Sequence, residues 1–371
     1  MKPVRILTRH FIPNYGSLLQ SLASVKIFED LGYEAQIIDY LPKHETSLGR
    51  VNALSKKFST NPIKRVPRWI LKFPDEFIKM ARFDKFRKKY LKQTQWFSSV
   101  EQLCEYDFKD SYLCTGSDQI WGYVYGKTID PTYFLPFAKE DSVCFAYSSS
   151  FGRTDFYDEY YPALTGWLEK FKFLTIREQS GVQLIHDNTP YHAENVLDPT
   201  LSIPRDFWKE FANVKPRKKP YMIIYHLRHN KKLEKYAKDL AKKNGWELIR
   251  ITTCIYDFLR PGKTLLLKDP AEVLSLFKHT QCVVTDSFHA TVFSLVFNRQ
   301  FVDILPPDTH ERITDLLKLV GLENRSYITD DEMSLDHALE PIDYDRVNAV
   351  LDEKREQSIE ILKKNLATLE K

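Results

Sequence analysis

One stretch near the end of the chain, QCVVTDSFHATVFSLVFNRQF at 281–301, restricts the fold more than any other. It begins with a short apolar run at 282–284, passes through a polar turn at 285–287, and stays apolar over 288–297. Periodicity alone does not separate a buried strand from a buried helix. The turn contains aspartate and serine, which are good N-cap residues, so we predict strand, turn and helix. His289 then lies in the first turn of a buried helix, at the end of a strand where open α/β sheets bind ligands.

Shorter strand and helix signals recur along the rest of the chain. Apolar runs at 4–7 and 36–40 flank a segment, 17–31, whose apolar residues repeat with helical spacing, so the chain opens with a βαβ unit. The pattern restarts at a strand predicted over 221–225 and continues through 281–301. Alternating strands and helices are typical of parallel sheets covered by helices. The sequence therefore predicts an α/β protein with two Rossmann-like domains that face each other across a cleft.

Proline content marks the boundary between the two domains. Residues 204–220 contain three prolines and few apolar side chains, so we predict an inter-domain linker there. The N-terminal domain then covers 1–203 and the C-terminal domain 221–340. The segment 341–371 has its apolar residues on one stripe, which predicts an amphipathic helix. A chain of 371 residues is long enough for two domains with separate cores.

The composition is that of a globular protein without a membrane-spanning segment. Hydrophobic residues make up 43% of the chain, and no run of about 18 apolar residues occurs. The first residues lead directly into a strand, without the apolar core and cleavage site of a signal peptide. The five cysteines form no C-x-x-C pair and several lie in apolar runs, which is typical of reduced thiols. We therefore expect a cytoplasmic protein.

The segment 55–92 is strongly basic, whereas the rest of the chain has a net charge of 4 − 10 = −6. It carries 13 Lys and Arg residues against three acidic ones, a net charge of +10, whereas the whole chain has +4. Apolar and aromatic residues are interleaved with the charges, and Pro67 and Pro74 are expected to break the first half of any helix. The segment fits a surface resting on anionic lipid, a groove stacking nucleic-acid bases, or a solvated helical insertion. We expect no nucleic-acid partner. In the lipid interpretation four basic residues make the contact: Lys85, Arg87, Lys88 and Lys89.

Polar residues stand where the predicted strands of both halves end. They are Asn14, Tyr15, Gly16, Ser117, Asp118, Ser149 and Arg177 in the first half, and His226, Arg228, Asp286, Ser287, His289 and Arg312 in the second. Residues 14–16 precede a helix whose first N–H groups can receive an anion or a sugar hydroxyl, and a capped tight turn has the same pattern. Arginine suits a carboxylate or a phosphate, because its guanidinium makes two parallel bonds.

The sequence shows no familiar metal or nucleotide pattern. Its histidines lack the close spacings to other ligands that zinc sites show, and neither G-x-G-x-x-G nor a Walker sequence occurs. We therefore expect neither a metal nor a nucleotide cofactor. His289 is the candidate for proton transfer, since an imidazole can give or take a proton near neutral pH. A structural histidine is the alternative, and Asp118 fits either a base or a turn-capping residue.

Six short motifs, taken in order, resemble those of the polysaccharide pyruvyl transferase family. They are NYGSLLQ at 14–20, GSDQIW at 116–121, YSSSFG at 147–152, REQSG at 177–181, VLDPTL at 196–201 and TDSFHAT at 285–291. The resemblance implies a fold similar to the B-type glycosyltransferases. It also implies transfer of the pyruvyl group of phosphoenolpyruvate to two hydroxyls of a sugar in a surface or capsular polysaccharide. The product is a cyclic ketal, phosphate is released, and no further cofactor takes part.

This implied reaction gives a role to all of these strand-end residues except Asp286. His289 is expected to protonate the donor, and Asp118 to orient or deprotonate an acceptor hydroxyl. Donor binding is expected from five residues, of which all but Arg177 belong to the C-terminal domain: Arg177, Arg228, Arg312, Ser287 and His226. Ser287 stands where some family members carry an arginine, so these arginines are expected to compensate. Acceptor binding is expected from the N-terminal domain: Asn14, Tyr15, Gly16, Ser117 and Ser149.

Two other functions fit the same residues. One is a glycosyltransferase of the same architecture that uses a nucleotide sugar. The other is a non-catalytic protein that binds a sugar or phosphate, since a fold does not fix a function. Thermal protection by phosphoenolpyruvate or by a nucleotide sugar separates the two enzymes, and a binding protein releases no phosphate. A lipid-linked acceptor would bring the protein to the inner face of the cell membrane.

Overall fold

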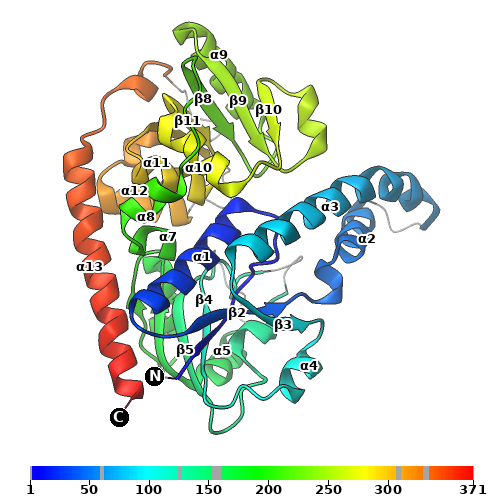
Figure 1. The fold of residues 1–371 in the computed structure, drawn as a ribbon, viewed down its shortest axis with the longest axis vertical. Helices are drawn as coiled ribbons and strands as arrows, with labels where there is room; N and C mark the ends of the chain where they lie inside the picture. Colours follow the sequence, from blue (N-terminus) through cyan, green and yellow to red (C-terminus); the bar gives the residue numbers. More distant parts are fainter. Residues whose placement is uncertain are drawn as a thin grey trace. The chain divides into compact units, whose positions relative to one another are not determined.

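The computed structural model describes residues 2–58, 62–123, 128–152, 160–305, 311–328 and 334–370. The chain divides into two compact units. The first is Met1–Pro199 together with Glu360–Lys371, and the second is Thr200–Ile359. Each unit contains one parallel β-sheet with helices packed on it (Figure 1). The predicted class, an α/β protein with two Rossmann-like domains, is therefore confirmed.

The first unit is built on a seven-stranded parallel sheet in the order β3-β2-β1-β4-β5-β6-β7. Its strands are β1 (Val4–Leu7), β2 (Ala35–Tyr40), β3 (Gln93–Phe97), β4 (Tyr112–Gly116), β5 (Val143–Ser149), β6 (Phe171–Ile176) and β7 (Glu194–Asn195). Its helices are α1 (Tyr15–Asp30), α2 (Ser47–Phe58), α3 (Pro62–Tyr90), α4 (Val100–Glu105), α5 (Tyr161–Leu168) and α6 (Gln179–Asn188). Short 3-10 helices lie at Lys43–Glu45 and Pro131–Phe134.

The second unit repeats this plan with six parallel strands in the order β10-β9-β8-β11-β12-β13. The strands are β8 (Tyr221–Tyr225), β9 (Glu247–Thr252), β10 (Lys263–Leu266), β11 (Cys282–Thr285), β12 (Gln300–Leu305) and β13 (Ser326–Ile328). The helices are α8 (Arg205–Phe211), α9 (Lys231–Asn244), α10 (Pro270–His279), α11 (Phe288–Val296), α12 (Glu311–Val320) and α13 (Tyr344–Leu369). Short α7 (Pro199–Ser202) stands at the boundary between the units. The strand, turn and helix predicted over 281–301 are confirmed as β11 and α11.

Each sheet contains one place where the strand order reverses direction. In the first unit β1 pairs with both β2 and β4, so the loops after β1 and β4 lead to opposite sides of the sheet. In the second unit β8 pairs with both β9 and β11. Ligands of open α/β sheets bind outside the carboxyl ends of the strands at such switch points. The topology therefore indicates that the loops after β1, β4, β8 and β11 are the candidate ligand-binding loops.

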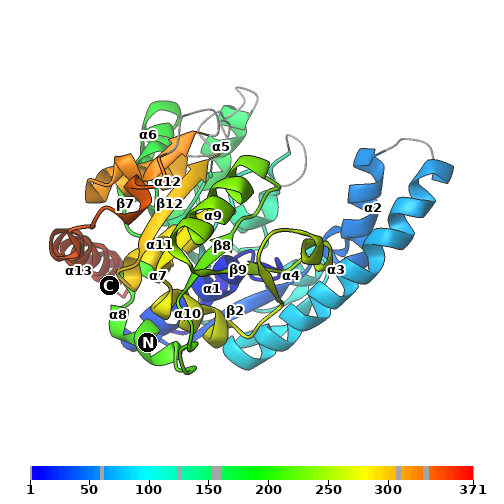
Figure 2. The same cartoon turned by 90° about the horizontal axis from the view of Figure 1, so that it is seen from above.

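Helices α2 and α3 form a helical pair that extends from the first unit, and they lie side by side in both views (Figures 1 and 2). The expected break is absent, because α3 continues through both Pro67 and Pro74. Both prolines are on the exposed side of α3, where water can hydrate the backbone carbonyls that lose their N–H partners. Arg87 is buried and donates to the Phe11 carbonyl oxygen at 3.2 Å, so it is not part of the basic surface predicted for this segment.

The segment predicted as a linker, 204–220, belongs to the second unit and contains helix α8. Trp208 explains the difference, because its fully buried ring packs edge-on against Phe293 of α11 at 5.2 Å. The predicted C-terminal helix is present as α13, whose last residues are grouped with the first unit. There the Tyr33 hydroxyl donates to Glu370 at 2.9 Å. Across the described parts of the chain, no helix is long and apolar enough to cross a membrane.

Candidate functional site

The loop after β4 has an unusual backbone conformation at the switch point of the first unit. Gly116 has φ +148°, and a Cβ added there would lie 1.9 Å from the Tyr147 carbonyl oxygen of β5. Only glycine fits so close to the neighbouring strand. Asp118 then adopts φ 70°, a left-handed conformation that few residues other than glycine occupy. Strain of this kind persists only where surrounding contacts hold the residue, and it occurs often at functional sites.

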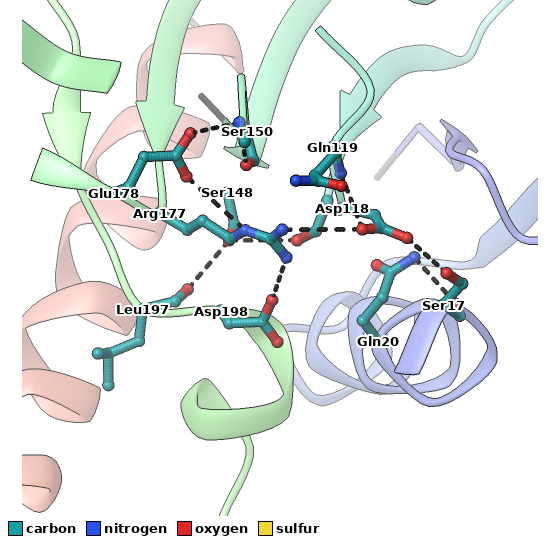
Figure 3. Close-up of polar contacts among 12 residues, drawn as sticks. Ser17, Gln20, Asp118, Gln119, Ser148, Ser150, Arg177, Glu178, Leu197 and Asp198 are labelled. Atoms are coloured by element: carbon teal, nitrogen blue, oxygen red, sulfur yellow. Dashed lines mark hydrogen bonds and ion pairs between the residues drawn. The ribbon is translucent and has the colours of Figure 1, made fainter. Parts of the chain in front are cut away.

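Asp118 is held by a contact with the first turn of α1 and by one within its own loop. The Ser17 hydroxyl in the first turn of α1 donates to Asp118 Oδ2 at 2.6 Å, and the Gln119 N–H donates to Oδ1 at 2.8 Å. Gln20 Nε2 donates to the Ser17 carbonyl oxygen at 3.0 Å and to Thr8 Oγ1 at 3.1 Å. The Asp118 carboxylate is thus fixed to the start of α1 (Figure 3).

Arg177, the residue after β6, lies beside Asp118 and among three carboxylates (Figure 3). Its Nη1 donates to Asp198 at 2.7 Å, and its other nitrogens lie 3.7 Å from Asp118 and from Glu178. Burial opposes the charge of the guanidinium, but the three carboxylates, Asp198 first, raise the pKa of Arg177. A cation surrounded by three anions does not attract a further anion. The structure therefore does not support the predicted role of Arg177 in donor binding. The guanidinium interacts with Asp118, Glu178 and Asp198 instead.

Glu178 connects this cluster to the loop after β5. Its Oε1 accepts from the N–H of Phe151 at 2.7 Å and from the N–H of Gly152 at 3.3 Å. Gly181 is needed beside it, because a Cβ there would lie 2.9 Å from Ile176 and 3.2 Å from Glu178 Oε1. Trp121 packs below the loops, stacked on Phe134 at 5.1 Å. The described residues of the loops after β4, β5 and β6 are therefore packed against one another.

The five residues predicted to bind the acceptor have different surroundings. Asn14 is the N-cap of α1, with its side-chain oxygen accepting from the Gly16 N–H at 2.7 Å. Tyr15 is buried, with its ring 5.2 Å from that of Phe83 in α3. Ser117 and Ser149 are fully buried, and the Ser149 hydroxyl donates to the Thr115 carbonyl oxygen at 3.2 Å. Of this set, only Asn14 is not buried, and it lies three residues before Ser17, which donates to Asp118.

At the switch point of the second unit, Asp286 joins the ends of β8 and β11. Its carboxylate accepts from the N–H of Leu227 at 2.7 Å and from the N–H of Arg228 at 3.4 Å. Burial raises the pKa of Asp286 to about 6, even though these two N–H groups and the Arg228 charge act in the opposite direction. The carboxyl group therefore titrates close to neutral pH. Two residues predicted to bind the donor lie next to this carboxyl group: Arg228 contacts it through its N–H, and Ser287 follows Asp286 in the sequence.

The first turn of α11 carries His289, which is 9% exposed. The ring of Phe288 lies edge-on to the imidazole at 5.2 Å, and the guanidinium of Arg312 in α12 lies over the same Phe288 ring at 5.5 Å. Beneath the helix, Thr291 donates to fully buried Asp303 of β12 at 2.8 Å. Burial, together with the Asp286 charge, raises the pKa of Asp303 well above its usual range. The predicted donor residues Arg228, Ser287, His289 and Arg312 are thus brought to one edge of this sheet.

His226 belongs to a neighbouring ionic cluster. Its Nε2 contacts the Arg250 guanidinium of β9 and lies 3.5 Å from Glu234 of α9. An imidazole that accepts a bond from an arginine is neutral, and burial first, then Arg250, lowers the pKa of His226. Arg260 and His229 complete the cluster around Glu234. The predicted donor contact of His226 is not supported, because its ring is committed to Arg250 and Glu234.

Sequence reasoning missed three residues of the first-unit site as functional candidates: Ser17, Glu178 and Asp198. Ser17 lies in the motif NYGSLLQ, Glu178 in REQSG and Asp198 in VLDPTL. Membership of these motifs was the signal in the sequence that could have identified them. Within the described ranges, no group of three or more His, Cys, Asp or Glu side chains could hold a metal ion. A separate cavity of about 220 Å³ lies at the opposite, amino edge of this sheet, beside Lys109 and Asp141. It is away from the loops that carry the site.

The raised pKa of Asp286 predicts a pH-dependent stability of the second unit. The proton that the folded state holds stabilises the fold fully below about pH 4, and this contribution is lost as pH rises to about 6. Between pH 4.5 and pH 7 the wild-type free energy of unfolding should therefore fall by about 2 kcal/mol relative to Asp286→Asn. Urea unfolding at pH 4.5 and 7 measures the difference. Asp345→Asn, at an exposed carboxylate of the same unit, is the control, and equal pH slopes for all three proteins would contradict the prediction.

Solved structures with a similar fold have very different sequences. OtsA in its apo form is 11% identical with a TM-score of 0.50, and the match covers 97% of this chain and 96% of OtsA. The calicheamicin glycosyltransferase CalG4 is 10% identical with a TM-score of 0.47, covering 99% and 98%. Heptosyltransferase II of E. coli is 10% identical with a TM-score of 0.40, covering 96% and 99%. At such identities the likeness concerns the fold alone. The fold of this chain is similar to that of OtsA, the one of these three with a TM-score of 0.50.

The sequence also matches a protein family. Residues 14–308 match the family described as polysaccharide pyruvyl transferase. This range includes the loops at the switch points of both sheets. Comparison with curated proteins gives no match. Because the family match covers most of the chain, the protein belongs to the polysaccharide pyruvyl transferase family. It is a transferase of polysaccharide biosynthesis, and its acceptor is a sugar or polysaccharide.

Proposed function

We propose that the protein transfers the pyruvyl group of phosphoenolpyruvate to two hydroxyls of one sugar in a surface or capsular polysaccharide repeat unit. A proton is added to the methylene carbon, and the first sugar hydroxyl bonds through its oxygen to the neighbouring carbon, C2, and loses its proton to a base. Of the two hydroxyl protons released in the reaction, one replaces the proton given to the methylene carbon and the other leaves with phosphate. The bond from C2 to the phosphate oxygen breaks and phosphate leaves. The second hydroxyl bonds to C2 and loses its proton, closing the ketal ring. This balance requires one general acid, one base and an anion site, and no cofactor.

The observation that carries the proposal is the position of Asp118. It is a carboxylate in a strained conformation, at the switch point of a sheet, held by Ser17 and beside Arg177. We propose that Asp118 orients or deprotonates the acceptor hydroxyl, with Asn14 and Ser17 at its side. Arg177 acts as a positioning residue that fixes Asp118 through charge.

The second unit supplies the groups that a trianionic donor requires. We propose that Arg312 and Arg228 bind the carboxylate and phosphate of phosphoenolpyruvate, and that Ser287 donates to a phosphate oxygen. His289 is the proposed general acid. Its place in the first turn of α11 puts it beside the helix N-terminus, which also favours an anion. Asp286 holds the backbone of the loop that carries Arg228.

A lipid-linked oligosaccharide is the proposed acceptor, which places the protein in the cytoplasm at the inner face of the membrane. The test is incubation of the purified protein with phosphoenolpyruvate and a panel of soluble and lipid-linked sugars. The expected result is phosphate release in equal amount to an acceptor that gains one pyruvyl ketal by mass spectrometry. Asp118→Asn should abolish both products. Thermal protection by a nucleotide sugar, with no phosphate released from phosphoenolpyruvate, would instead identify a glycosyltransferase.

A further inference from the structure

Helix α3 exposes a continuous face made of two different halves. At 100° per residue, its exposed side chains from Val66 to Lys89 fall on one side of the helix. The first half of this face is apolar: Val66, Ile70, Leu71, Phe77 and Ile78, each between 46% and 62% exposed. The second half is basic: Arg82, Lys85, Lys88 and Lys89. We call these nine residues the α3 outer face. Large apolar side chains gathered in this way on a surface mark an interaction site.

The opposite face of α3 holds the loop that leads to the candidate site. Phe83 and Phe86 pack against Tyr15, and Arg87 donates to the Phe11 carbonyl oxygen. Earlier in the helix, Glu76 pairs with Arg50 at 3.0 Å. Arg50 in turn pairs with Glu45, which also binds Arg9 of the loop after β1. Ser17, two residues after Tyr15, donates to Asp118. Helix α3 therefore packs against the segment that leads to the proposed acceptor residues.

The charge of the segment selects the kind of partner. Residues 55–92 carry a net charge of +10, which opposes contact with the same face of a second copy and favours an anionic surface. The apolar half matches the boundary between headgroups and acyl chains, while the basic half matches headgroup phosphates. Stacking on nucleic-acid bases would need open aromatic faces, but Trp69, Phe73 and Phe77 stack on one another at 4.8 and 5.9 Å.

We propose that the α3 outer face binds the surface of an anionic membrane, with its apolar half inserted and its basic half on the headgroups. This inference rests on the proposed function in one respect: a lipid-linked acceptor would then be delivered beside the loop that α3 supports. The contact itself needs neither phosphoenolpyruvate nor catalysis. Membrane binding and pyruvyl transfer are therefore separable by experiment.

The test is flotation of the full chain with vesicles of phosphatidylcholine, alone or mixed with phosphatidylglycerol. Wild type should bind the mixed vesicles, and the quadruple variant R82E/K85E/K88E/K89E should bind them on the order of 10²–10³-fold more weakly. The variant I70S/F77S/I78S should also bind more weakly, at unchanged net charge. The matched control is K231E/K235E/K238E/K242E, which replaces four exposed lysines of α9. It changes the net charge by the same amount and should retain binding. Circular dichroism and melting curves verify that each variant is folded.

Several results would overturn the inference. They are equal losses in the α3 and α9 variants, binding indifferent to vesicle charge, tighter binding to a single-stranded oligonucleotide, or a change of oligomeric state in the α3 variants. Phosphate release with a soluble acceptor is measured on the same proteins and should be unchanged in the α3 variants. Wild-type turnover without vesicle binding would reject the membrane contact alone. Vesicle binding without turnover on any acceptor would reject the proposed reaction alone.

Discussion

Replacing His289 by asparagine is expected to lower the rate of pyruvyl transfer about 10²–10⁴-fold, with little change in the binding of phosphoenolpyruvate. Asparagine retains a polar side chain of similar size but supplies no titratable proton. If His289 protonates the methylene carbon, the loss falls on kcat and on kcat/KM together, because the interaction exists only in the transition state. Steady-state phosphate release gives both constants, and thermal protection by phosphoenolpyruvate measures donor binding independently.

A second histidine of the same unit provides the control. His279 ends helix α10, so His279→Asn should leave turnover close to wild type. A pH profile separates proton transfer from a structural role, because the alkaline limb of kcat, where a general acid loses its proton, should change only in the His289 variant. Unchanged turnover of His289→Asn would remove this histidine from the mechanism. Loss of donor protection in the same variant would indicate that His289 binds the donor instead.

Replacing Arg177 by methionine is expected to destabilise the first unit by about 3–5 kcal/mol. Methionine has a similar length, but it leaves Asp118, Glu178 and Asp198 buried without the cation that now neutralises them. Urea unfolding followed by tryptophan fluorescence measures the loss, since Trp121 is fully buried in this unit. The loss should shrink at low pH, where the carboxylates become protonated, and in the double variant R177M/D198N.

Arg205→Met is the matched control for this prediction. Arg205 also forms an ion pair, at 2.8 Å to Asp352, but both side chains are partly exposed, so the loss should be below about 1 kcal/mol. A stable Arg177→Met protein that no longer gains thermal protection from phosphoenolpyruvate would support the donor role that the sequence first predicted. A destabilised protein that still responds to the donor would support the positioning role.

Much of the fold was predictable because its signals are local. A short apolar run followed by Asp286 and Ser287 predicts a strand that leads into a helix, and β11 and α11 occupy those positions. The expected side-chain cap is absent, because Ser287 makes no capping bond and Asp286 accepts from Leu227 and Arg228 instead. The order of such units predicts parallel sheets. The six family motifs mark the loops at the carboxyl ends of the strands, where topology alone places ligands. These features depend on neighbouring residues and needed no knowledge of distant contacts.

What only the tertiary structure decided is the direction and the partners of individual side chains. Arg177 meets Asp118 and Asp198, which are 59 and 21 positions away in sequence, so no periodicity relates them. Arg87 and Lys88 are adjacent in a basic segment, yet one is buried under the Phe11 loop and the other is exposed. The sequence by itself determined where strands end and which residue types stand there, because backbone propensity and apolar spacing are local. Charge pairing in the interior depends on which segments the folded chain brings together.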